Sequence, residues 1–450
     1  MANMKIDSTV RAAGVAKSAD RLLELAGKKA RLIDRTWDAS KGTPVFTVAG
    51  KYATRGWTEW TQGFQYGLPI LVFDVTGEKD LLELGRANTL KRMAVHLTHI
   101  GVHDHGFNNL STYGNLRRLM REGKIPHDEW ELNFYELAIK SSGAVQAARW
   151  ADGVDGGYVY SFNGPHSLFI DTMRTIRILG VAHQLGHVLM GENDRKISLL
   201  DRLITHGLTT AKYSVYYGQG RDAYDLHGRV THEAIFNRND GRFRCPNSQQ
   251  GYSPFSTWTR GLAWAILGFA EELEFLQLMA VKQEVLAVFE KAARATADFY
   301  IDQATATDGI PYWDTGSPNL HKLGDWQSRN AEPMNDHEPV DSSAAAIAAQ
   351  GLIRLGKYLG KDGERYSAAG LTVTRSLFAT PYLSESAEHQ GLILHSIYHR
   401  PNGWDYVPAG RKIPCGESSM WGDYHVVELA VLVRRMASSS YFTFFDGREK

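Results

Sequence analysis

The sequence contains few cysteines and prolines, carries no net charge and has no long apolar run. Its 450 residues include 50 Lys and Arg, 50 Asp and Glu, 2 Cys and 14 Pro. Zero net charge excludes a globally basic nucleic-acid binder. A local basic pocket that binds an anionic substrate remains compatible with it. Two cysteines cannot form the usual structural zinc site, and free thiols are the simpler interpretation. The composition is that of an ordinary globular protein.

The N-terminal region shows no pattern of an export signal. Charged residues such as Asp7, Arg11 and Lys17 interrupt it, so no apolar segment follows a basic start. No stretch approaches the roughly 18 apolar residues of a membrane-spanning helix. We therefore expect a cytoplasmic protein, with neither nucleic acid nor a membrane among its partners. The sequence does not indicate its oligomeric state.

Apolar residues recur at helical spacing through most of the chain, while strand signals are short and weak. No linker interrupts the pattern, so we expect one catalytic domain over residues 1–450, with 1–17 as a flexible N-terminal arm. The prediction is an all-α fold, a closed ring of helical hairpins, with an α-solenoid as the alternative. Strands are expected at 45–48, 158–162 and 392–398. Helices are expected at 18–36, 61–75, 79–99, 130–150, 170–187, 195–217, 256–278, 283–304, 342–358, 363–377 and 424–436.

The first candidate site is the polar segment His103-Asp104-His105-Gly106-Phe107-Asn108-Asn109, expected to be a loop. Two histidines, one aspartate and two asparagines within seven residues suit acid/base chemistry or the binding of hydroxyl groups. A metal site would need both histidines and the aspartate to converge, and a solvated loop is a further alternative.

The second candidate is Asp171, which follows the apolar run Leu168-Phe169-Ile170 and opens an expected helix. One interpretation is a helix N-cap. The other is a carboxylic acid beside an apolar wall, whose pKa rises by burial or by a second carboxylate until it can donate a proton near neutral pH.

The third candidate is the segment from Gln250 to Trp264, which also contains Trp258 and Arg260. A cation in the first turn of a helix opposes the helix dipole, so Arg260 is expected to have a partner elsewhere. That partner is either a protein carboxylate or a substrate carboxylate. The two tryptophans lie six residues apart, which is not one helix face, so at least one is expected to face a cleft.

Seven segments match, in order, the motifs of one known family, from about Trp57 to the last expected helix. They are Trp60-Thr61-Gln62-Gly63-Phe64, His103-Asp104-His105-Gly106-Phe107, Ile170-Asp171-Thr172-Met173, Gly251-Tyr252-Ser253 through Trp264, Pro311-Tyr312-Trp313-Asp314, Asp341 through Ala348, and Trp421-Gly422-Asp423-Tyr424. With these motifs the chain resembles the unsaturated glucuronyl hydrolases, glycoside hydrolase family 88.

This resemblance implies an (α/α)6 barrel that acts on small oligosaccharides, without a metal or organic cofactor. The substrate would carry a 4,5-unsaturated uronic acid at its non-reducing end. Such an enzyme hydrates the C4=C5 double bond, and the resulting hemiketal opens and expels the remaining sugar. The rule that relates carboxylate spacing to retention or inversion does not apply to this reaction.

By position, the resemblance assigns the general acid/base to Asp171 and the second essential aspartate to Asp104. The second aspartate would bind ring hydroxyls and help keep the first protonated by like-charge repulsion. Arg260 would steer the uronate carboxylate. The substrate-binding positions are Trp60, His103, His232, Gln250, Trp258, Arg260, Trp264 and Trp421.

The chain departs from the family pattern at Leu262, at Pro254-Phe255, at Val340 and in a longer segment over 315–339 that could reshape the pocket mouth. These departures leave open the natural polysaccharide, the linkage, the sulfation and the leaving sugar. The alternatives are an unsaturated rhamnogalacturonyl hydrolase or another (α/α)6 uronide hydrolase, a non-catalytic carbohydrate-binding barrel, and an epimerase with a pair of active histidines.

Overall fold

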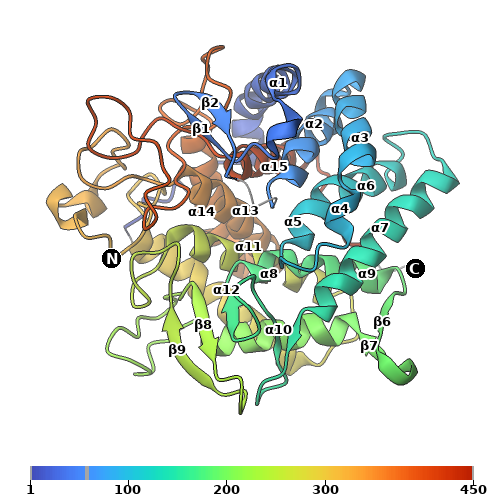
Figure 1. The fold of residues 1–450 in the computed structure, drawn as a ribbon. Coiled ribbons are helices and arrows are strands. Elements are labelled where there is room, and N and C mark those ends of the chain that lie inside the picture. The colour runs from blue at the N-terminus through green and yellow to red at the C-terminus, as the bar shows by residue number, and fades with distance from the viewer. Residues whose placement is uncertain (1–2, 56–59, 448–450) are drawn as a thin grey trace.

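The computed structural model describes residues 3–55 and 60–447, so Trp57 lies outside the described part of the chain. Helices form two concentric layers in it (Figure 1). The outer layer consists of α1 (Ala12–Thr36), α3 (Lys79–Arg92), α7 (Glu129–Ala148), α10 (Leu199–Tyr213), α12 (Gln283–Phe299) and α14 (Glu364–Leu377).

The inner layer has six positions among the described residues. They are α2 (Gln62–Thr76), α5 (His105–Asn109) with α6 (Asn115–Arg121), α8 (Thr172–Thr175) with α9 (Arg177–Gln184), α11 (Thr259–Leu276), α13 (Ser342–Leu359) and α15 (Met420–Ala437). Each inner helix packs on the next, and α15 contacts both α13 and α2. The ring therefore closes, which confirms the predicted closed ring of helical hairpins and rejects the α-solenoid.

The layers differ in how their helices are buried. Outer helix α12 buries one stripe that includes Phe289, Ala293 and Phe299, whereas all residues of inner helix α11 are buried. Inner helices approach closely through small residues. A Cβ on Gly106 would lie 2.0 Å from the carbonyl oxygen of Thr175, so α5 and α8 pack as they do only with glycine there.

The strands are short and lie in the loops. β1 (Phe46–Val48) pairs with β2 (Lys51–Ala53), β3 (Trp150–Ala151) with β4 (Tyr158–Val159), and β6 (Val188–Met190) with β7 (Lys196–Ser198), all antiparallel. A three-stranded antiparallel sheet has the order β5 (Ser167–Phe169), β8 (Glu233–Phe236), β9 (Phe243–Asn247). Its register places Phe169 opposite Glu233, and the Ile170 N–H donates to the His232 carbonyl at 3.0 Å, one residue before Asp171.

Three expectations from the sequence need correction. Residues 1–17 were expected to form a flexible arm, but α1 begins at Ala12, and Met4 and Val10 are buried against the barrel. The described part of this segment is therefore packed, because its apolar side chains join the hydrophobic core. The segment expected as a loop over 103–109 enters helix α5 at His105. Residues 392–398 form no strand, only a bridge between Ile393 and Leu383, because aspartate side chains accept several of their backbone N–H groups: Asp423 those of Leu392 and Ile393, and Asp405 that of Tyr398.

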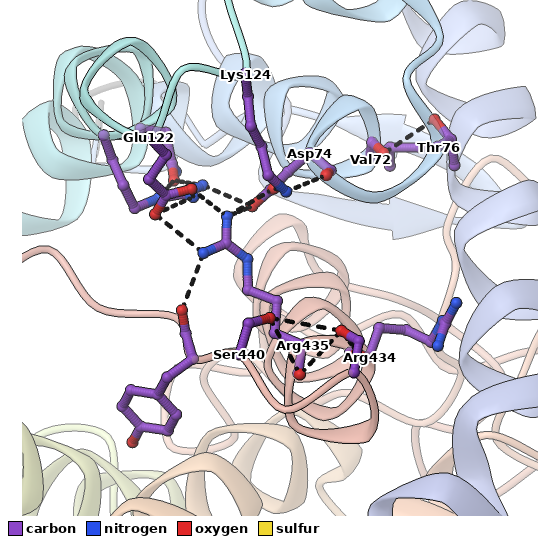
Figure 2. A network of polar contacts seen from close by, with 12 residues as sticks. Val72, Asp74, Thr76, Glu122, Lys124, Arg434, Arg435 and Ser440 are labelled. Carbon is purple, nitrogen blue, oxygen red and sulfur yellow. Dashed lines mark hydrogen bonds and ion pairs between the residues drawn. The ribbon is translucent and has the colours of Figure 1, made fainter.

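A buried ion network joins three inner helices at their C-terminal ends (Figure 2). The Asp74 carboxylate of α2 lies 2.8 Å from Arg118 of α6 and 2.7 Å from Arg435 of α15, and it also binds Lys124. Arg435 in turn lies 2.5 Å from Glu122. This network is remote from the N-terminal ends of α2 and α15, where the candidate site lies.

The described part of the chain contains no helix that is long and apolar enough to cross a membrane. Both cysteines are free thiols, Cys245 exposed and Cys415 buried, as expected from the sequence. In residues 3–55 and 60–447, no three His, Cys, Asp or Glu side chains are grouped to hold a metal ion.

Candidate active site

A cavity of about 780 Å³ opens where the inner helices begin. The short segments before these helices supply its floor, which is why the predicted motifs converge although they are spread along the chain. All the predicted site residues except His232 and Trp421 line it. The lining consists of Trp60, Val102, His103, Asp104, Phe107, Phe162, Asp171, Gln249, Gln250, Trp258, Arg260, Trp264, Tyr398, His399, Asn402 and Trp404.

The two aspartates meet at one imidazole. His103 Nε2 lies 2.9 Å from Asp171 Oδ1 and 4.0 Å from Asp104 Oδ1. Asp171 stands at the N-cap position of α8 but makes no capping hydrogen bond with its side chain. The N-cap interpretation is therefore wrong, and the carboxylate is directed to His103 instead. Asp104 and Asp171 are only 8% and 7% exposed, at the bottom of the cavity.

Burial and neighbouring charges shift the pKa values of two of these groups. Burial raises the pKa of the Asp104 carboxyl, and the charge of Asp171 adds to the rise against the opposing charge of His103. Burial lowers the pKa of His103, but the Asp104 charge and the hydrogen bond to Asp171 outweigh it, so the pKa is raised overall. The cluster therefore holds a proton more firmly than an exposed imidazole would.

Arg260 has protein partners on both terminal nitrogens. Nη1 donates to Asp341 Oδ2 at 3.0 Å and to a backbone carbonyl, and Nη2 donates to Gln250 Oε1 and to the Tyr398 carbonyl at 2.8 Å each. The guanidinium also lies near two indoles, 4.6 Å from the centre of the Trp258 ring. Of the two partners expected from the sequence, the structure contains the protein carboxylate.

The second indole is that of Trp421, whose ring centre lies 4.9 Å from the guanidinium. Burial lowers the pKa of Arg260, against the charge of Asp341. The terminal nitrogens of Arg260 hold Gln250 and the Tyr398 loop in place, and its role in steering a uronate carboxylate stays a prediction.

Aromatic rings form the walls of the cavity. Trp60 stacks on the fully buried Trp421 at 5.0 Å and 26°, and Trp264 packs on Phe107 at 4.7 Å. Both Trp258 and Trp264 face the cavity, since Trp258 precedes α11 rather than lying on it. Such walls suit the apolar faces of a sugar ring.

His232 and Trp421 stand behind the lining. His232 Nδ1 accepts hydrogen bonds from the backbone of Gln249 at 3.0 Å and of Gln250 at 3.3 Å, and its ring packs on Trp258 at 4.7 Å. Burial lowers the pKa of His232 to about 3, so the ring is neutral and its proton is on Nε2. Both residues therefore position lining residues.

Sequence reasoning missed the segment from Tyr398 to Trp404, which forms one side of the mouth. Its mixture of aromatic, histidine, asparagine and glycine residues resembles the 103–109 segment and could have drawn attention. The longer segment at 315–339 does not line the cavity: Glu338 is buried, where it accepts hydrogen bonds from Trp313 Nε1 and the Asn319 backbone at 2.8 Å each.

Comparison with known proteins agrees with this geometry. No family model matches the chain. It is 26% identical over 420 residues to an unsaturated chondroitin disaccharide hydrolase of Streptococcus pyogenes serotype M1, covering 90% of this chain and 88% of the relative. It is 25% identical over 374 residues to an unsaturated glucuronyl hydrolase of Formosa agariphila, covering 82% and 78%.

The fold is that of a solved unsaturated glucuronyl hydrolase specific for heparin, with a TM-score of 0.73 at 20% identity over 94% of this chain and 98% of that chain. This confirms the (α/α)6 barrel. The resemblance seen in the sequence motifs is thus confirmed, and the chain is a relative of the unsaturated glucuronyl hydrolases.

Proposed function

We propose that the protein is a glycoside hydrolase that releases a 4,5-unsaturated uronic acid from the non-reducing end of lyase-generated oligosaccharides. The proposal rests on the relatives named above and, above all, on one observation: Asp171 and Asp104 share the His103 imidazole at the bottom of a tryptophan-walled cavity. A cavity with its acidic groups at the bottom suits an enzyme that takes the end of a chain. We propose that residues 1–450 act as a single catalytic domain.

The proposed reaction consumes one water. The Asp171 carboxyl gives its proton to C4 while the oxygen of water bonds to C5, and the water proton passes to the Asp171 carboxylate. The product is a hemiketal at C5. Its ring C5–O bond breaks to give a C5 ketone and a hydroxyl on C1, and C1 then releases the leaving sugar as an alcohol and becomes an aldehyde. Asp171 regains its starting state.

The neighbours of Asp171 have supporting roles in this proposal. His103 Nε2 lies in hydrogen-bond contact with Asp171, so the proton that the imidazole holds passes to the Asp171 carboxyl group, which then protonates C4; the charge of Asp104 keeps the proton in the cluster until then. Asp104 also accepts hydrogen bonds from ring hydroxyls. Gln250, anchored by Arg260 and His232, donates to the uronate carboxylate. The tryptophan walls exclude water from the remaining faces of the ring.

The test follows the ultraviolet absorbance of the conjugated double bond with unsaturated disaccharides prepared from several glycosaminoglycans. We expect loss of absorbance with at least one disaccharide. Asp171→Asn should lower kcat by about 100-fold or more, because the amide still accepts a hydrogen bond from His103 but cannot donate a proton. Asp362→Asn, at an exposed aspartate in the short turn before α14, is the matched control. Normal turnover in Asp171→Asn would contradict the assignment.

The cytoplasmic location expected from the sequence stays a prediction, and fractionation of the native host cell would test it.

A further inference from the structure

A buried arginine at the end of α7 joins two loops of the active site. Arg149 is 5% exposed, and among the described residues its guanidinium donates hydrogen bonds only to backbone carbonyls. Nη1 donates to the Ile100 carbonyl, in the loop before α5. Nη2 donates to the Ser161 carbonyl at 2.8 Å and Nε to the Tyr160 carbonyl at 3.3 Å, both in the loop before β5. Arg149 therefore fixes the separation of the two loops.

The two loops enclose the imidazole of the catalytic cluster. The loop before α5 continues from Ile100 to His103 and Asp104, and the loop before β5 continues from Ser161 to Phe162. The Phe162 ring stacks on the His103 ring at 5.9 Å and 27°. Among the described residues His103 Nδ1 has no hydrogen-bond partner, so ring packing must complete the orientation that the Nε2 contact begins. The separation of the loops thus sets the position of the imidazole.

Both loops have further contacts. The Tyr160 ring lies 4.3 Å from the Arg149 guanidinium, and the Tyr160 N–H donates to the Arg149 carbonyl at 3.1 Å. In the loop before α5, Thr175 Oγ1 of α8 donates to the His103 carbonyl at 2.8 Å, and His105 Nε2 lies 3.0 Å from a carbonyl oxygen. Loss of the guanidinium should therefore loosen the link between the loops while the loop before α5 stays attached to the barrel.

Contact with a carboxylate does not neutralise the charge of Arg149. In the described part of the chain its acceptors are three carbonyl oxygens, and it forms no ion pair. Burial lowers the pKa of Arg149, against the charge of Asp104, but an arginine stays protonated near neutral pH. Burial raises the pKa of Asp104 and lowers that of His103, and the charge of Arg149 lowers both. Arg149 therefore opposes the retention of a proton in the cluster.

Other titratable groups surround the cluster. They are His99 and His105 beside α5, Asp171 before α8, His206 of α10 and His232 before β8. Burial lowers the pKa of His105, of His206 and of His232 to about 3, so these three rings are neutral near pH 7. Arg260, which lines the same cavity, is paired with Asp341. Arg149 is thus the neighbouring cation, within the described residues, that neither titrates nor pairs with a carboxylate.

A general acid has to release its proton as well as hold it, and it works best when its pKa lies near the working pH. A fixed positive charge beside a buried acid cluster favours release. We propose that Arg149 is a positioning residue of this active site: its guanidinium fixes the two loops that enclose the His103 imidazole, and its unpaired charge eases the transfer of the proton to the substrate. The inference rests on the proposed function and adds a residue to its mechanism.

Two variants separate the hydrogen bonds of Arg149 from its charge. Arg149→Lys keeps the charge but offers one nitrogen in place of three, so kcat should fall about tenfold while His103 titrates at an unchanged pH. Arg149→Gln also removes the charge, so kcat should fall further and His103 should titrate at higher pH. NMR of the histidine rings follows this titration without substrate, and the His103 signal is identified by its absence in His103→Asn. Arg202→Met is the matched control, since this arginine stacks on the Trp150 ring at 3.8 Å, outside the two loops.

Thermal unfolding first establishes that each variant is folded. If Arg149→Gln is not, Arg149→Met replaces it in both measurements, because it buries no polar group. An unchanged titration of His103 in the neutral variant overturns the proposal, and so does wild-type kcat in Arg149→Lys. Equal losses in Arg202→Met also overturn it, since they would trace the effect to overall stability. A wild type that turns over none of the unsaturated disaccharides refutes the proposed function, whereas the NMR titration still decides the role of the charge.

Discussion

Replacing Arg260 with methionine should destabilise the protein and should not act through a lost contact with the substrate carboxylate. The change leaves the Asp341 carboxylate, which is fully buried, without its guanidinium. Removing one partner of a buried ion pair costs about 3–5 kcal/mol. For 450 residues the entropy of unfolding is about 1 kcal/mol per kelvin, so Tm should fall by roughly 3–5 °C.

The assay is thermal unfolding with two comparison variants. Arg365→Met removes an arginine that is 43% exposed and pairs with Asp298 at 3.0 Å; such a surface pair is worth about 0–1 kcal/mol, so Tm should barely change. Arg260→Met combined with Asp341→Asn should recover much of the loss, because the buried charge is removed while a helix-capping oxygen stays.

Kinetics distinguish the two roles of Arg260. As a positioning residue it holds Gln250 and the Tyr398 carbonyl, so Arg260→Met should lower kcat/KM by the same factor on a uronate substrate and on its methyl ester. A variant with unchanged Tm that loses activity only on the free acid would refute the reasoning and restore Arg260 as the direct ligand of the carboxylate.

Three further outcomes follow from single groups. Burial raises the pKa of Asp74, but the cations around it bring the pKa down to about 2. Asp74→Asn should therefore lower the free energy of unfolding by about 2 kcal/mol above pH 4. Thermal unfolding at decreasing pH should show this difference between variant and wild type vanish as pH falls towards 2. Gly106→Ala should lower both Tm and kcat, since its Cβ would meet the Thr175 carbonyl. Gly14→Ala in α1, where a Cβ would have no neighbour within 4 Å, should instead raise the free energy of unfolding by about 0.5–1 kcal/mol. Equal melting temperatures of the two variants would contradict this reasoning. The raised pKa of His103 keeps the acid cluster protonated, so His103→Asn should lower kcat and move the alkaline limb of the pH–rate profile to lower pH. An unchanged limb would mean that the imidazole does not hold the proton used in the reaction.

The outer helices could be predicted because each has one solvent-exposed polar face and one buried apolar face. The helix expected at 363–377 differs from outer helix α14 by only one residue at its start. The inner segment 105–121 could not be predicted in this way. It is buried on every side, so no polar face gives it a period, and its glycines, asparagines, Ser111 and Thr112 are weak helix formers.

The candidate site was accessible through motifs that stand at helix starts, but the partners of its charged groups were not. Arg260 meets Asp341, which is 81 residues away in the sequence and adjacent only because α11 and α13 are neighbours in the ring. The same holds for His103 and Asp171, which are 68 residues apart. Such pairs form only when the barrel closes. The sequence shows where helices lie but not which helices become neighbours, so it does not predict these pairs.

The arrangement of the two aspartates favours hydration over direct displacement of the leaving sugar. Displacement uses two carboxyl groups that flank the glycosidic bond and act separately, one as the acid and the other as the base or nucleophile. Here both carboxylates approach the same nitrogen of His103, at 2.9 and 4.0 Å, so they belong to one cluster around that imidazole. From this cluster one carboxyl can protonate C4 and then take a proton from water arriving at the adjacent C5, which requires a single acid/base group with a firmly held proton. Against the effect of burial, the charge of Asp104 and the hydrogen bond to Asp171 raise the pKa of His103, so this imidazole holds a proton within reach of the Asp171 carboxyl group.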